Sequence, residues 1–159
     1  MVVEVNMKVL VAVDDSHFAD GVADFVASQP FAENCSIHVI SVVENMLIGS
    51  YMSVLPSPVI SEMRDKVRAK MKEKLDKVLE RLAKSFAADR LSSEILEGFP
   101  ADEIVEAAVR LDADLIVVGT RGRKGINRFV MGSVSQKVLL AAPCSVMICR
   151  SKAETKSPE

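Results

Sequence analysis

A glycine-rich, basic segment that follows an apolar run is the part of this sequence best suited to chemistry. Residues 119–133 read GTRGRKGINRFVMGS, with the spacing Gly-x2-Gly-x9-Gly-Ser. Gly119 and Gly122 allow the backbone to turn tightly and bring its N–H groups close to an anion. Gly132 and Ser133 precede a predicted helix, whose free N–H groups and dipole favour phosphate. The segment therefore predicts phosphate binding, although a plain strand-to-helix connection with a basic edge fits the spacing as well.

Other reactive residue types lack the neighbours that catalysis or metal binding requires. Neither His17 nor His38 has a Cys, His or carboxylate partner at metal-ligand spacing. Nothing in the sequence indicates His and Asp companions for Ser133, so we do not predict a hydrolase triad. The three cysteines lie mostly in apolar runs and form no CxxC motif, which predicts buried thiols. We therefore expect no catalytic residue and no protein-held metal.

Five short apolar runs predict the strands of one sheet. Runs of this kind, rich in β-branched residues and bounded by polar or helix-breaking residues, are typical of strands buried in a parallel sheet. The run at 91–97 is the most polar and suits a sheet edge. The predicted strands cover residues 8–13, 36–43, 91–97, 115–118 and 144–150.

Helical patterns alternate with these runs. The longest starts near Ile60, and its apolar residues recur every three or four positions as far as Phe86. Strands that alternate with helices predict an α/β fold, with a single open parallel sheet and helices on both of its faces. Such folds bind ligands at the carboxyl ends of the strands, where the strand order switches. The segment at 119–133 follows the fourth strand and would lie at that edge.

Composition places the chain among proteins of a single domain. It has 159 residues, of which 49% are hydrophobic and 26% charged, as in an ordinary globular domain. No apolar run approaches the roughly 18–20 residues that cross a bilayer, and residues 1–6 lack the basic start of a signal peptide. We therefore expect a cytoplasmic protein without membrane contact. One domain would cover 7–150, between a short extension at 1–6 and a disordered tail at 151–159.

The net charge of −2 conceals two basic blocks. Residues 64–84 carry nine basic and four acidic side chains, and residues 121–128 carry four basic and no acidic ones. A helix of mixed charge is usually a solvated surface, but the first block also fits a module that binds RNA, DNA or an acidic partner. Aromatic residues make up only 4% of the chain and Trp is absent, so we expect no base-stacking surface for nucleic acid.

The glycine spacing, in its setting, resembles that of the universal stress protein family. The segments DADLIVVGTRG and SVSQKVLLAAPCSVMICR flank the loop as in that family, and MKVLVAVDDS and SIHVISVVEN resemble its first two strands. The resemblance covers about residues 7–150. It implies the strand order 3-2-1-4-5, a homodimer and, in members with this glycine motif, bound ATP. Ser145 departs from the pattern, because the family often has proline there.

The resemblance also implies where a nucleotide would lie. Adenine and ribose would meet Ala12, Val13 and Asp14 at the end of the first strand, and Val42 would offer backbone hydrogen bonds to the adenine edge. Asp14 has two interpretations: it holds the ribose or a water of bound Mg²⁺, or it merely precedes a helix. The phosphates would lie on Gly119, Thr120, Arg121, Gly122, Arg123, Gly132, Ser133, Val134 and Ser135.

Three functions remain open from the sequence. The first is a regulatory protein that holds ATP, ADP or AMP, hydrolyses it slowly or not at all, and signals to an unknown protein partner. The second is an enzyme of the related adenine-nucleotide hydrolase type, and the third is a binding module that uses the basic helix at 64–84. The apolar strand at 144–150, placed at a sheet edge by the family order, predicts a homodimer through that strand.

Overall fold

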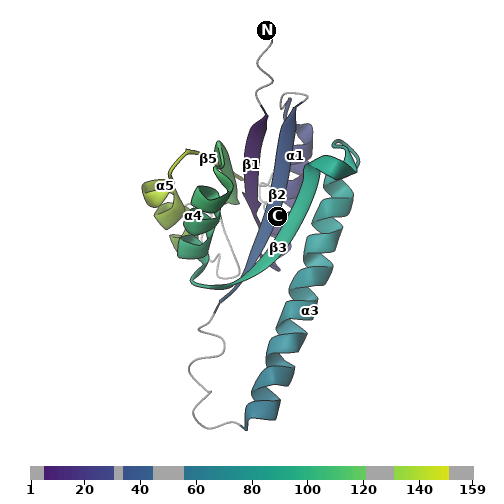
Figure 1. Cartoon of the computed structure of the whole chain (residues 1–159), viewed down its shortest axis with the longest axis vertical. Coiled ribbons are helices and arrows are strands. Elements are labelled where there is room, and N and C mark those ends of the chain that lie inside the picture. The colour runs from purple at the N-terminus through teal and green to yellow at the C-terminus, as the bar shows by residue number, and fades with distance from the viewer. Residues whose placement is uncertain (1–5, 31–33, 45–55, 121–130, 151–159) are drawn as a thin grey trace, which may run out of the picture.

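A single five-stranded parallel sheet organises the chain (Figure 1). The structure, a computed structural model, describes residues 6–30, 34–44, 56–120 and 131–150. The strand order is β3-β2-β1-β4-β5, which confirms the order that the family resemblance implied. The strands are β1 (Met7–Ala12), β2 (Cys35–Glu44), β3 (Leu91–Gly98), β4 (Leu115–Gly119) and β5 (Ser145–Cys149).

The central strand is β1, and its sequence explains that position. Val9, Leu10 and Val11 are all at most 2% exposed, as expected for β-branched and aliphatic residues covered on both faces. Val9 lies opposite Ile37 of β2 on one side and Leu115 of β4 on the other. Because successive side chains point to opposite faces, Val9 and Val11 join one core cluster and Leu10 joins the other.

Helices cover both faces of the sheet, as predicted. The helices α1 (Phe18–Ser28) and α3 (Ser57–Leu82) pack on one face. The helices α4 (Pro100–Leu111) and α5 (Ser133–Ala141) pack on the other, and Figure 1 shows α3 and the α4–α5 pair on opposite sides of the strands. In the described ranges, no helix is both long enough and apolar enough to cross a membrane.

Only the second half of α3 packs on the sheet. The helix has 26 residues and runs past the carboxyl ends of the strands, as Figure 1 shows at the bottom of the view. It begins slightly before Ile60 and ends before Phe86, which instead donates its N–H to the Leu82 carbonyl over 3.0 Å. The first buried residue, Met71, lies just past the midpoint of the helix. The buried residues follow the helical repeat and are Met71, Leu75, Val78 and Leu82.

Candidate functional site

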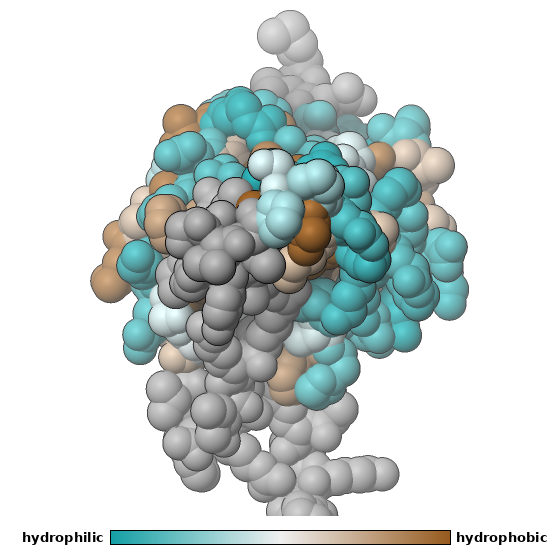
Figure 2. Space-filling view, turned by 90° about the horizontal axis from the view of Figure 1, so that it is seen from below, coloured by the Kyte–Doolittle hydropathy of each residue, from teal (hydrophilic) through white to brown (hydrophobic). Residues whose placement is uncertain are grey.

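The carboxyl ends of β1 and β4 meet at the point where the strand order switches. The two strands are neighbours, but the chain leaves β1 for α1 on one face and leaves β4 for α5 on the other. Departures to opposite faces are the arrangement in which open α/β sheets form a crevice and bind their ligands, and we call this edge the switch-point crevice. Figure 2 views the molecule from this side. Hydrophilic residues cover most of the described surface there, and hydrophobic residues form small separate patches.

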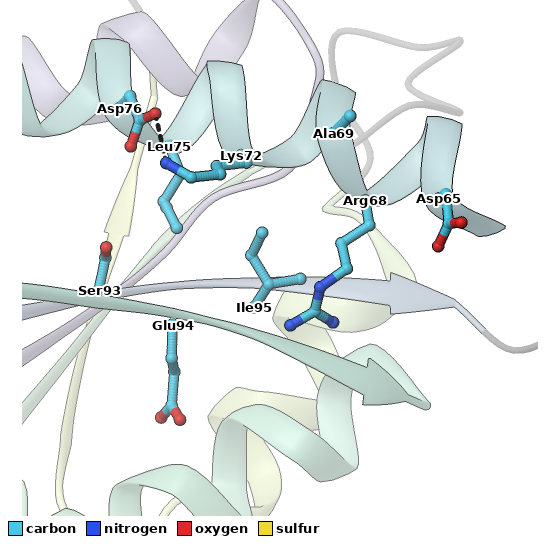
Figure 3. A pocket seen from close by; sticks show the side chains of 9 residues that line it. All are labelled: Asp65, Arg68, Ala69, Lys72, Leu75, Asp76, Ser93, Glu94 and Ile95. Atoms are coloured by element: carbon cyan, nitrogen blue, oxygen red, sulfur yellow. Dashed lines mark hydrogen bonds and ion pairs between the residues drawn. The ribbon is translucent and has the colours of Figure 1, made fainter.

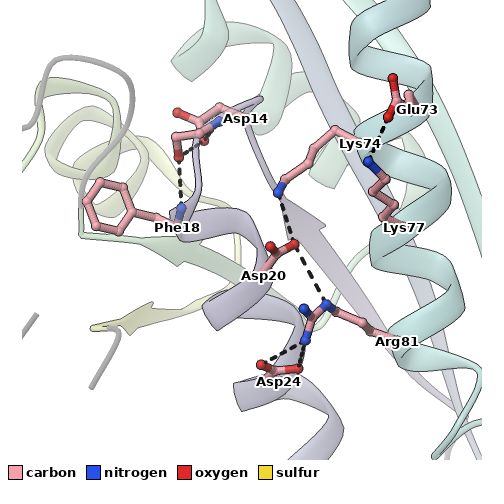
Figure 4. Close-up of polar contacts among 9 residues, drawn as sticks. Asp14, Phe18, Asp20, Asp24, Glu73, Lys74, Lys77 and Arg81 are labelled. Carbon is pink, nitrogen blue, oxygen red and sulfur yellow. Dashed lines mark hydrogen bonds and ion pairs between the residues drawn. The ribbon is translucent and has the colours of Figure 1, made fainter. Parts of the chain in front are cut away.

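Asp14 organises the turn between β1 and α1. Its Oδ1 accepts hydrogen bonds from the Ser16 backbone N–H, over 3.1 Å, and from the Ser16 hydroxyl, over 2.5 Å. The Ser16 hydroxyl oxygen in turn accepts from the Phe18 N–H over 3.3 Å, at the first residue of α1 (Figure 4). Asp14 therefore does precede and shape a helix start. Its other oxygen, Oδ2, takes no part in these bonds.

Both backbone polar groups of Val13 are hydrogen-bonded to β2. Its N–H donates to the Ile40 carbonyl over 3.0 Å, and its carbonyl accepts from the Ser41 hydroxyl over 2.8 Å. Val13 therefore contributes shape to the crevice, and the half-buried Ala12 lies beside it. Ser41 is 2% exposed and had no predicted role. The sequence does hint at a role for Ser41, because it is the one hydroxyl-bearing residue in the apolar second half of the predicted strand at 36–43.

Val42 presents its backbone where β1 has already ended. The last register pair between β1 and β2 is Ala12 with Ile40, so the end of β2 extends beyond its neighbour. Ile40 directs its carbonyl toward β1, and backbone groups of a parallel strand face alternate sides. The N–H and carbonyl of Val42 therefore face the space beyond the end of β1. This geometry suits the role in adenine recognition that was implied for Val42.

The ends of β4 and β5 are tied to the start of α5 by hydrogen bonds. The Thr120 N–H donates to the Cys149 carbonyl over 2.9 Å, and the Gly132 N–H donates to the Thr120 carbonyl over 2.8 Å. The Ser135 hydroxyl donates to the Gly119 carbonyl over 2.7 Å, and Ser135 is 4% exposed. The structure thus brings together both ends of the predicted phosphate loop. Ser135 serves through its side chain as an internal brace.

The first turn of α5 supplies the donors that a phosphate needs. Gly132 is the N-cap residue and makes no side-chain capping bond, and α5 has nine residues. The N–H groups at the start of an α-helix have no partner within the helix. Ser133 is exposed and Val134 half-buried, so this turn borders solvent. The predicted site residues Arg121, Gly122 and Arg123 lie outside the described residues.

The described residues provide no separate metal centre or reactive thiol at this site. Among them, no group of three or more His, Cys, Asp or Glu side chains is placed to hold a metal ion. Cys149, which lies opposite Gly119 in the sheet, is 4% exposed. Burial raises the pKa of the Cys149 thiol to about 12, so the thiol stays protonated and unreactive at neutral pH.

The basic block at 64–84 forms ion pairs along α3. Seven of its nine basic residues have an acidic partner within 4.0 Å, some on α3 itself and others on the β1–α1 turn, α1 and β3. Basic side chains that already pair with acidic ones attract nucleic-acid phosphate only weakly. The pairs therefore favour a solvated, ion-paired helix surface over a nucleic-acid-binding one. The pairs are Lys66–Glu62, Arg68–Glu97, Lys70–Asp15, Lys72–Asp76, Lys74–Asp20, Lys77–Glu73 and Arg81–Asp24.

A hollow between α3 and β3 is distinct from the predicted site. Its volume is about 440 Å³, within the usual range for small-molecule pockets. Figure 3 shows Ser93 and Ile95 pointing toward α3, while Glu94 points to the opposite face of the sheet. Most of the lining residues are charged, and two of them, Lys72 and Asp76, already pair with each other along α3 over 2.8 Å. This arrangement does not suit an adenine ring.

Comparison with known proteins gives consistent matches across nearly the whole chain. The sequence profile of the universal stress protein family matches residues 6–150. Universal stress protein YxiE of Bacillus subtilis is 34% identical over 151 residues, covering 90% of this chain and 98% of the relative. Universal stress protein MJ0531 of Methanocaldococcus jannaschii is 46% identical over 61 residues, a match that spans 38% of this chain and only 36% of that relative.

Solved structures share the fold. Universal stress protein UspA from Lactobacillus plantarum superposes with a TM-score of 0.77 at 28% identity, covering 91% of this chain and 98% of that one. The universal stress protein from Archaeoglobus fulgidus in complex with dAMP gives a TM-score of 0.63 at 24% identity, covering 89% and 96%. The profile match, the full-length relative and the strand order agree, and the chain belongs to the universal stress protein family.

Proposed function

We propose that this protein binds an adenine nucleotide, ATP with Mg²⁺ in the first place, and acts as a nucleotide-dependent regulator. One observation carries the proposal: the first turn of α5 is bonded to the end of β4 through Thr120 and Gly119, beside the switch-point crevice. Helix N-termini at this position are suited to phosphate. The Archaeoglobus fulgidus relative with the same fold is a complex with dAMP, an adenine nucleotide.

Each part of the nucleotide has a proposed partner in the chain. The backbone of Val42 would hydrogen-bond the adenine edge, and Ala12 and Val13 would pack beside the ring and ribose. The remaining carboxylate oxygen of Asp14 would accept from the ribose. The phosphates would lie on the glycine loop and on the start of α5. The loop residues are Gly119, Thr120, Arg121, Gly122 and Arg123, and those at the start of α5 are Gly132, Ser133, Val134 and Ser135.

The donor set fits Mg²⁺ that arrives with the nucleotide. Mg²⁺ retains several waters and is usually held by phosphate oxygens and one or two carboxylates. Ser16 occupies one carboxylate oxygen of Asp14, and the other makes no hydrogen bond to a described residue, which leaves it available in this proposal. When bound, the ion would neutralise phosphate charge. Asp14 would orient one of its waters.

We propose a switch with slow or no hydrolysis. Fast phosphoryl transfer needs a positioned base and stabilisation of the transition-state charge. Asp14 is the carboxylate proposed for this site, and its two bonds from Ser16 commit Oδ1 to the turn. The alternative, an adenine-nucleotide hydrolase, requires turnover of about 1–1,000 s⁻¹ that is lost in Ser133→Ala. Steady-state phosphate release distinguishes the two.

We further propose a cytoplasmic homodimer that pairs through β5. β5 is an edge strand, and Val146, Met147 and Ile148 make its centre apolar. Pairing with its own copy across a two-fold axis would satisfy the free backbone groups of the edge and close the assembly.

Nucleotide release and calorimetry test the proposed function. Mass analysis of freshly purified protein should detect an adenine nucleotide, and titration should show binding of ATP, ADP or AMP but not of GTP. Gly122→Val should abolish binding with an unchanged circular dichroism spectrum, because a side chain there obstructs the approach of phosphate. Gly125→Val, outside the three-glycine spacing, should retain binding. A well-folded wild type that binds no adenine nucleotide at millimolar concentration contradicts the proposal.

A further inference from the structure

The turn that carries Asp14 is held from outside by α3. Two consecutive residues of α3 lie near this turn: Lys70 contacts Asp15, and Met71 contacts Ser41, which is bonded to Val13. The Lys70 ammonium forms an ion pair with the Asp15 carboxylate over 3.0 Å. Met71 is 2% exposed, and its Sδ lies 3.0 Å from the Ser41 hydroxyl that donates to the Val13 carbonyl. α3 thus contacts Asp15 directly and reaches Val13 only through Ser41, so that Asp14 lies between two residues that α3 supports.

The Lys70 contact differs from the other ion pairs of the helix. The Asp15 side chain is only 8% exposed, whereas the Lys70 side chain is 70% exposed. A carboxylate withdrawn from water requires compensating charge and hydrogen bonds. By contrast, Lys66 pairs with Glu62 on its own helix, and both side chains are well exposed at 74% and 67%. Lys70 therefore compensates the buried carboxylate of Asp15, whereas Lys66 forms a solvent-exposed pair within α3.

Further ion pairs fix α3 lengthwise against α1. Lys74 donates to Asp20 over 2.9 Å, and Arg81 donates to Asp24 over 2.8 Å (Figure 4). Figure 4 shows Lys74 and Arg81 extending from α3 toward successive turns of α1, which begins directly after the Asp14 turn. The register of α3 on α1, and with it the place of Lys70, is therefore set by charge as well as by the buried apolar residues.

We infer that Lys70 is a positioning residue of the nucleotide site, acting through Asp15 on the turn that presents Asp14. This rests on the proposed nucleotide binding and adds its regulation: a change that removes the cation at Lys70 alters the affinity for the nucleotide, although Lys70 does not contact the nucleotide. Residues in one network of this kind couple measurably, and we expect Lys70→Met to weaken adenine-nucleotide binding by about three- to tenfold.

The experiment uses the full chain and matched variants on the same helix. AMP and ATP are titrated calorimetrically into wild type, Lys70→Met, Lys70→Arg and Lys66→Met, and each apoprotein is melted. We expect weaker binding only for Lys70→Met, with Lys70→Arg close to wild type because the cation is retained. The melting temperature of Lys70→Met should fall below that of Lys66→Met, because the buried Asp15 carboxylate loses its cation, so binding is measured well below both melting temperatures. The inference is overturned if Lys70→Met binds the nucleotide like wild type. It is also overturned if Lys70→Arg, which keeps the positive charge, binds as weakly as Lys70→Met.

Two further measurements separate this inference from the proposed function. In an Asp15→Asn background, Lys70→Met should cause no additional loss, because its effect passes through the Asp15 carboxylate. Without nucleotide, amide hydrogen exchange at residues 14–18 should be faster in Lys70→Met than in Lys66→Met. Failure of wild type to bind adenine nucleotides overturns the proposed function, and the exchange result then decides by itself whether Lys70 holds the turn. Equal exchange in the two variants contradicts that role.

Discussion

The two edge strands of the sheet, β3 and β5, differ in both composition and surroundings. On β3, Ser92, Ser93 and Glu97 are exposed, and Arg68 of α3 reaches Glu97 over 3.1 Å. On β5, the central residues are apolar and only half-buried. Polar and charged residues protect an edge from pairing with other chains, whereas an apolar, β-prone edge invites it. The difference agrees with the proposed homodimer, in which a second copy would complete the β5 edge while α3 and polar side chains protect the β3 edge.

The largest expected effect comes from proline on β5. Because the Cys149 carbonyl accepts from Thr120, the alternation along a parallel strand turns the backbone of Met147 toward β4 and that of Val146 outward. Val146→Pro should therefore remove an outward donor and convert the dimer to monomer, since proline is tolerated where its missing N–H faces away from the sheet. Sedimentation velocity at micromolar concentration measures the change.

Met147→Pro is the internal comparison for that variant. It should break the ladder to β4 and lower the stability of the fold itself by about 1–3 kcal/mol, because a buried backbone group of β4 loses its hydrogen-bond partner. Thermal melts separate this loss from a loss of dimerisation. A wild type that sediments as a monomer, or a Val146→Pro variant that stays dimeric, would show that β5 is protected in some other way.

A smaller effect is expected at the inner face of β3, where Glu94 accepts bonds from His38, over 3.0 Å, and from Arg110. Burial alone would raise the pKa of the Glu94 carboxyl, but the bonds from Arg110 and His38 outweigh burial and lower the pKa. The carboxylate thus stabilises the fold above its ordinary pKa of 4.5, and this contribution disappears as the pH falls through the lower, folded value. Arg110→Met should cost about 1 kcal/mol at pH 7.

The pH dependence distinguishes this contribution from a packing effect. Denaturant unfolding of wild type and Arg110→Met should give stabilities that converge as the pH decreases below 4.5. A difference that stays constant down to acid pH would mean that the Arg110 side chain contributes by packing alone.

The smallest effect is expected on the outer side of β3. The Arg68 and Glu97 side chains are 51% and 33% exposed, and such ion pairs contribute little because water and salt screen them. Arg68→Met should change the free energy of unfolding by less than about 0.5 kcal/mol and should leave the sedimentation of the protein unchanged. New self-association in this variant would reveal that the pair guards the β3 edge.

The fold was predictable from local patterns, and the fine structure of the site was not. Apolar runs, glycines and prolines indicated every strand, the polar edge at β3 and helices on both faces. The glycine spacing indicated the segment whose two ends meet at Gly119 and Gly132. The contacts that tune the crevice join residues far apart in the chain, such as Ser41 with Val13 and Lys70 with Asp15. No local periodicity records which serine or lysine of many will reach such a partner.

A long stretch of sequence also separates β1 from β4, one of its two neighbours in the sheet, and this matters during synthesis. β2 follows β1 closely, but the Lys8 N–H meets the Asp114 carboxylate across 106 positions of sequence. At about 5–20 residues per second, the ribosome needs on the order of 5–20 s to produce that interval. During that period the edge of β1 that will pair with β4 has no partner strand. The fold therefore finishes late, and the ribosome-bound intermediate, with β1 half covered, is the species that chaperones would meet.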